Sequence, residues 1–305
     1  MTKNKGKKYS LTDFFVGYFE NVGKLTLANL MICVPMAFFG GIIYVLSLFG
    51  LLNIFSLFLF IPLISPFVGG LFYVCLKVVR GQKLSLFKDY IKGIKENALY
   101  FFLDSLIFYF VGIGMFITFS YYRTGIEGAA MFISFILSLI GLLFFICFQN
   151  NILTMSVSVK LKFSEIIKNS VVLVVTGLFG HFKTILSISL IAIILYTMNV
   201  VAGNAIVILI VGAISTLFFL PVLCTYIIVF NTYQAIEKQI VLPYQEETEN
   251  AAVKKSNNFS EITPAEIKEL RVLAKGPDDE YVSFRGRMLR RSTIRRLIEN
   301  HSDVE

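Results

Sequence analysis

The sequence predicts an all-α, polytopic membrane protein with six transmembrane helices and a small cytoplasmic C-terminal appendage. Three observations lead to this fold class. Only 16% of the residues are charged and 56% are hydrophobic, whereas about 25% of the residues of a soluble domain are charged. Two stretches, of 52 and 53 residues, carry no formal charge at all. Lys and Arg are also spread very unevenly over the segments that separate the apolar blocks.

The number of helices follows from the lengths of the apolar blocks. A helix needs about 20 apolar residues to cross a bilayer core about 30 Å thick. Each uncharged stretch therefore holds two spans, and one further span lies on each side of a short polar connection at residues 121–128. The expected spans are residues 25–48, 54–76, 98–120, 130–156, 184–201 and 206–232.

The distribution of basic residues predicts the orientation. Of the 28 Lys and Arg residues, only Arg123 lies in a connection expected on the outer side. The others lie in the N-terminal segment, in two basic loops at residues 77–95 and 160–183, and in the C-terminal tail. Because cytoplasmic segments retain Lys and Arg, we expect both termini in the cytoplasm.

The composition divides the chain into three parts. Residues 1–24 form a basic cytoplasmic N-terminus, residues 25–235 the six-helix transmembrane domain, and residues 236–305 a cytoplasmic linker with a basic appendage. In the appendage, Pro264 favours the start of a helix that reaches about residue 274. A hairpin is expected around Arg285 and Gly286, and Ser292 is expected to cap a last helix that runs through Asn300.

The sequence offers no constellation typical of an enzyme. The four Cys residues are isolated within apolar runs, and the two His residues lie far apart. No nucleophile elbow, metalloprotease motif or phosphate-binding glycine loop occurs. We therefore expect a protein that is not an enzyme and has no catalytic, cofactor or metal site.

Polar residues inside the predicted spans form the candidate intramembrane site: Asp104, Asn150 and Asn151. Asp104 lies about 12 Å below the interface if Glu96 marks it, and an ionisable group at that depth typically marks a solute, proton or ion path. Two alternatives stay open. The helix could begin later and leave Asp104 near the headgroups, or these side chains and Gln149 could simply bond across helices.

Basic side chains form the candidate contacts with a partner or with lipid. Those of the first loop are Lys77, Arg80 and Lys88, and those of the tail are Arg290, Arg291 and Arg295. A basic cluster beside a membrane most simply binds anionic lipid headgroups. An acidic protein or RNA is a less favoured partner of the tail.

The end of the second span and the first basic loop contain a characteristic set of residues: Tyr73, Leu76, Lys77, Arg80, Phe87, Lys95 and Asn97. With these residues the segment resembles that of the YesL-like family of bacterial integral membrane proteins. Lys168, Asn169 and Ser170 resemble the second cytoplasmic element of that family. The resemblance covers residues 14–235. It implies a location in the bacterial plasma membrane and an association with carbohydrate utilisation and ABC-type sugar transport, without a known biochemical activity.

Three functional hypotheses follow. The first is an accessory component of a solute uptake system, with carbohydrate as the solute, that presents its two basic loops to ABC-transporter subunits. The second is an autonomous transporter or channel that uses the intramembrane polar residues. The third is a membrane scaffold whose basic tail binds lipid or RNA.

Overall fold

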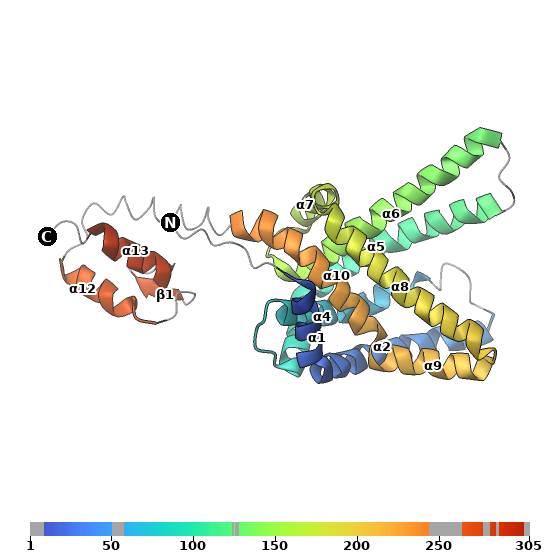
Figure 1. The fold of residues 1–305 in the computed structure, drawn as a ribbon, viewed down its shortest axis with the longest axis horizontal. Coiled ribbons are helices and arrows are strands. Elements are labelled where there is room, and N and C mark those ends of the chain that lie inside the picture. The colour runs from blue at the N-terminus through green and yellow to red at the C-terminus, as the bar shows by residue number, and fades with distance from the viewer. Residues whose placement is uncertain are drawn as a thin grey trace. The chain divides into compact units, whose positions relative to one another are not determined.

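The computed structural model describes residues 9–50, 58–123, 125, 128–243, 264–276, 281–284 and 287–301. The chain divides into two compact units, Met1–Glu237 and Lys238–Glu305, which are described separately below (Figure 1). The predicted turn near residues 50–53 lies largely outside the described residues, as do the Lys residues before Tyr9 and most of the linker after residue 243.

Five helices of the first unit are long and apolar enough to cross a membrane, and a bent pair of helices makes a sixth span if the two are counted as one. The all-α, polytopic fold class is thus confirmed. The five single helices are α2 (Val22–Leu48), α4 (Phe60–Val79), α5 (Leu86–Arg123), α6 (Gly128–Ser158) and α8 (Leu178–Ala202).

The sixth span is not the continuous helix that the sequence analysis expected at residues 206–232. It consists of α9 (Ala205–Phe218) and α10 (Leu220–Ile236), which meet at Phe219 with a bend of 50°. A short π-helix, η1 (Glu237–Val241), follows. Pro221 lies in the first turn of α10, where its missing N–H and fixed backbone angle are tolerated. The break therefore places this proline where a new helix can begin.

Two short helices accompany the spans. α1 (Leu11–Glu20) begins with a capping box between Ser10 and Asp13, and α7 (Phe163–Thr176) occupies the second basic stretch ahead of α8. The ring of Tyr9, just before α1, lies against the ring of Tyr233 near the end of α10, with 6.4 Å between centroids. The N-terminal segment and the end of α10 therefore lie at the same end of this unit.

The interior of the first unit is built around α4. In its most apolar window 61% of the residues are buried, against 6–17% in the other four single-helix spans. Those four helices thus turn most of their apolar surface outward, as membrane-spanning helices do where they face lipid. Figure 1 shows α5 and α6 side by side, extending away from α2, α8 and α9 toward their connection. The rings of Phe108 and Phe145 lie 5.8 Å apart between α5 and α6.

The second unit contains α12 (Pro264–Leu273), an antiparallel pair of strands β1 (Tyr281–Phe284) and β2 (Arg287–Arg290), and α13 (Arg291–His301). Leu270, Phe284 and Ile294 form its small core. The start of α12 and the hairpin are confirmed, although residues 285 and 286 lie outside the described residues. The expected Ser292 cap is wrong, because β2 continues directly into α13 and leaves Ser292 inside the first turn.

Candidate functional site

A cavity of 530 Å³ that is open to the outside of the first unit is lined by residues of α2, α4, α5, α6 and α10. Its walls are mostly apolar. Two of the three predicted intramembrane site residues, Asp104 and Asn150, line it, and they are joined there by Gln149 and Pro221. The structure therefore brings together an acid from α5, two amides from α6 and the first turn of the broken sixth span.

Asp104 is deeply buried, with 2% of its surface exposed. The Gln149 side chain donates a hydrogen bond of 3.4 Å from Nε2 to Oδ2 of Asp104. Within the described residues, Oδ1 of Asp104 and Oε1 of Gln149 have no hydrogen-bond partner. The bond from Gln149 fits the alternative of interhelical bonding, which accounts for one of the two oxygens of Asp104.

Asn151 lies on another side of α6 and does not line the cavity. Its Nδ2 donates to the backbone oxygen of Ser170 at 3.3 Å and lies 3.2 Å from Nε2 of His181. Successive residues of an α-helix are rotated by about 100°, so Asn151 points away from the side on which Gln149 meets Asp104. Here the interhelical alternative holds, since Asn151 links α6 to α7 and α8.

Asn29 of α2 bridges the two halves of the broken span. Its Nδ2 donates to the backbone oxygens of Thr216 and Leu217 at 2.7 and 2.8 Å, and its Oδ1 accepts the N–H of Val222 at 2.8 Å. One side chain thus satisfies backbone groups at the end of α9 and the start of α10. A bond across helices is the common role of an amide in a span, but the break that Asn29 bridges was not predicted. Pro221 was the available signal, because a proline in an apolar span leaves backbone groups that need partners.

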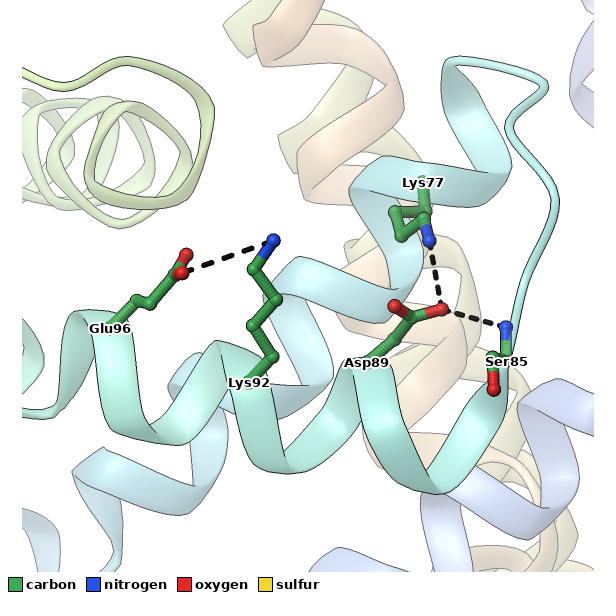
Figure 2. A network of polar contacts seen from close by, with 5 residues as sticks. All are labelled: Lys77, Ser85, Asp89, Lys92 and Glu96. Atoms are coloured by element: carbon green, nitrogen blue, oxygen red, sulfur yellow. Dashed lines mark hydrogen bonds and ion pairs between the residues drawn. The ribbon is translucent and has the colours of Figure 1, made fainter.

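The residues of the first basic loop are held together by an ion pair (Figure 2). Lys77 at the end of α4 and Asp89 in the first turn of α5 lie 2.8 Å apart, and the backbone N–H of Ser85 donates to the same carboxylate oxygen at 2.7 Å. Lys92 and Glu96 form a looser pair at 3.9 Å. Lys77 thus has a structural partner, whereas Lys88 is exposed.

Arg80 links the end of α4 to α10 and to the end of α6, just before the second basic loop. Its Nε donates to the hydroxyl of Tyr233 at 3.0 Å, and its Nη2 donates to the backbone oxygen of Ser158 at 2.9 Å. The guanidinium also lies over the Tyr233 ring, 4.9 Å from the centroid, which adds a cation–π attraction. We call this end of the first unit the basic end. It is defined by Arg80, Lys92, Lys160 and Lys162.

The arginines of the tail make structural contacts within the second unit. Arg291 donates from Nε to the backbone oxygen of Leu273 at 3.2 Å. Arg295 donates to the oxygens of Ala274 and Gly276 at 3.1 and 2.7 Å. Cations at a helix C-terminus satisfy its last carbonyls and favour the helix dipole. Two of the three tail arginines therefore stabilise the end of α12, and Arg290 forms the end of β2.

The apolar helices define a multi-pass integral membrane protein. No protein-family model matches the chain, and neither does any curated protein or solved structure. Among the residues that the structure describes, no group of three or more His, Cys, Asp and Glu side chains could hold a metal ion. The cavity beside Asp104 and the basic end are therefore the features of the structure that bear on function.

Proposed function

We propose that this protein is a membrane carrier that binds a lipophilic organic cation in the cavity beside Asp104. The observation that supports the proposal is a buried carboxylate with one oxygen unpartnered among the described residues, in the wall of a 530 Å³ cavity. Ligand pockets have volumes of about 300–1,000 Å³. A buried carboxylate is costly unless a cation or a proton compensates it.

The rest of the lining explains the preference for a lipophilic ligand. Phe60, Phe101 and Phe108 line the cavity together with aliphatic side chains of α2, α4 and α6. Aromatic faces attract organic cations, and the attraction is stronger where water is excluded. A sugar needs many hydrogen-bonding groups at the surface of its site, whereas the exposed surface of this cavity is almost entirely apolar. The chemistry of the cavity therefore supports an organic cation rather than a carbohydrate.

The broken span gives the cavity a wall that can change shape. Pro221 and Thr225 of α10 line the cavity just after the 50° bend at Phe219. In many transporters the substrate site lies beside such discontinuous helices. A small rotation of α10 about the break would alter access to Asp104 while α4, the buried central helix, stayed in place.

Transport can be tested with the full-length protein in vesicles that contain trapped DNA, with external ethidium as the cationic probe. The wild type should accelerate ethidium entry, and Asp104→Asn should slow the protein-dependent rate by about tenfold or more, which corresponds to about 1.4 kcal/mol. Glu96→Gln is the matched control, because this acid lies at the basic end and outside the cavity; its rate should not change. Ethidium entry no faster than in empty vesicles, or equal rates for Asp104→Asn and the wild type, would rule the proposal out.

A second candidate is an accessory component of a carbohydrate uptake system in the bacterial plasma membrane, with the basic end in the cytoplasm. The observation that favours it is the contact of Arg80 with Ser158, which links the first basic loop to the end of α6, just before the second basic loop. Lys83 and Lys88 of the first loop are exposed. An acidic face of an ABC-transporter subunit would complement such a surface.

This second candidate predicts the outcome of gentle affinity purification from native membranes. ABC-transporter subunits should accompany the wild type in stoichiometric amounts, and Lys83→Glu combined with Lys88→Glu should reduce their yield by about tenfold through charge repulsion. Recovery of the protein alone, or of subunits in equal yield with both proteins, would count against an accessory role that depends on the loops.

A further inference from the structure

A second cavity, of 620 Å³, lies at the basic end. The segments that form it are far apart in the sequence: the end of α4, the first half of α5 and the connection between α6 and α7. Its lining contains four cations, Arg80, Lys92, Lys160 and Lys162, and a single acid, Glu96. Such an excess of positive charge in a hollow attracts an anion.

The polypeptide around this cavity is fixed by contacts that do not involve a ligand. Tyr100 of α5 donates from its hydroxyl to the backbone oxygen of Leu161 at 3.2 Å, and its ring lies 5.7 Å from that of Phe163. These contacts attach the α6–α7 connection to α5. Lys160 and Lys162 flank Leu161 directly, so the cavity carries both side chains on an anchored segment.

Arg80 is also fixed by contacts that do not involve a ligand. Its bonds to Tyr233 and Ser158 use two of the five N–H donors of a guanidinium. A positioned guanidinium recognises phosphate well, because its planar fork can donate two parallel hydrogen bonds. Lys92, Lys160 and Lys162 add positive charge to the cavity. Their ammonium groups can donate to a phosphate without requiring one fixed hydrogen-bond geometry.

We propose that this cavity binds the phosphate group of an organic phosphate ester. The volume of this cavity is within the range of sites for small organic ligands. The cavity can therefore hold the organic group of the ester as well as the phosphate, with Tyr73 and Asn97 among the residues that line it. This site is separate from the Asp104 cavity and does not depend on the proposed carrier function. Two sources share the chemistry, a soluble phosphate ester and the headgroup of an anionic lipid.

The test uses the full-length protein in a neutral detergent and two probes, sn-glycerol 3-phosphate and dioctanoyl phosphatidylglycerol. We expect saturable binding of at least one probe by titration calorimetry. Binding of the soluble ester assigns the site to soluble phosphates, whereas binding of the lipid alone assigns it to a headgroup. Asp104→Asn should bind the same probe as tightly as the wild type, so failure of the carrier proposal would leave this result unchanged.

Two double variants test whether the phosphate ester binds in this cavity. Lys160→Ala with Lys162→Ala should weaken binding by about tenfold or more, because two charge-assisted contacts are lost. Lys88→Ala with Lys95→Ala removes the same charge from exposed lysines of α5 outside the cavity lining, and should change the affinity by less than about twofold. Binding of neither probe, or equal losses in the two double variants, would overturn the proposal.

Discussion

Asn29→Leu is expected to lower the free energy of unfolding by about 2–4 kcal/mol. The Asn29 side chain is fully buried and makes three bonds of 2.7–2.8 Å to backbone groups at the break of the sixth span. Interhelical hydrogen bonds in membranes contribute about 0.6 kcal/mol each on average, but a buried group left without a partner costs about 1–3 kcal/mol. Leucine has nearly the same size, so the loss would come from the missing bonds.

Unfolding of the purified protein in mixed micelles with increasing dodecyl sulfate measures this change. Asn231→Leu is the control, because within the described part of the chain the Asn231 side chain donates only to the oxygen of Ile227 in its own helix, at 3.1 Å. The carbonyl of Ile227 also takes part in the backbone hydrogen bonding of the helix. We therefore expect Asn231→Leu to lower the free energy of unfolding by less than about 1 kcal/mol. Equal losses in the two variants would contradict the role assigned to Asn29 at the break.

Gly93→Leu is expected to have a still larger effect on folding. A Cβ at Gly93 would lie 2.6 Å from the Cβ of Tyr73 and 3.0 Å from the Cα of Gly70. Helices α4 and α5 therefore cross with their backbones in near contact, and α4 is the centre of the unit. Overpacking of a tight site costs about 1–3 kcal/mol for small additions. We expect about this loss for Gly93→Ala and at least about 4 kcal/mol for Gly93→Leu.

The same dodecyl sulfate titration distinguishes this effect from a general intolerance of leucine. Among the residues that the structure describes, none has an atom within 4 Å of a would-be Cβ at Gly41 of α2, so Gly41→Leu should leave the unfolding midpoint nearly unchanged. A Gly93→Ala variant as stable as the wild type would show that the two helices can separate at no cost, contrary to the packing described here.

The spans could be predicted because their signals are local. The uncharged stretches and the roughly 20 residues that a span needs locate the helices in the sequence, and Pro264 marks the start of α12 as expected. The break at Phe219 was missed, although Pro221 was visible. Apolar composition alone cannot distinguish a continuous span from two helices that meet at a bend.

The site residues were only partly predictable, because their partners come from other helices. The sequence at residues 149–151 indicates polar groups within a span. Because successive residues of a helix are rotated by about 100°, these side chains are expected to point in different directions. Nothing local reveals that Gln149 faces Asp104 or that Asn151 faces His181. Likewise, the contact of Arg80 with Ser158 depends on how α4 and α6 pack, which the sequence pattern does not specify.

Equilibrium binding of tetraphenylphosphonium to the full-length protein in neutral detergent tests the central claim, that the Asp104 cavity holds a lipophilic cation. The wild type should bind the probe saturably, and Asp104→Asn should weaken binding by about tenfold or more. Ile64→Trp, which fills the cavity from α4 and leaves Asp104 unchanged, should weaken it as well. Absence of saturable binding, or equal affinities for the wild type and both variants, would contradict the account.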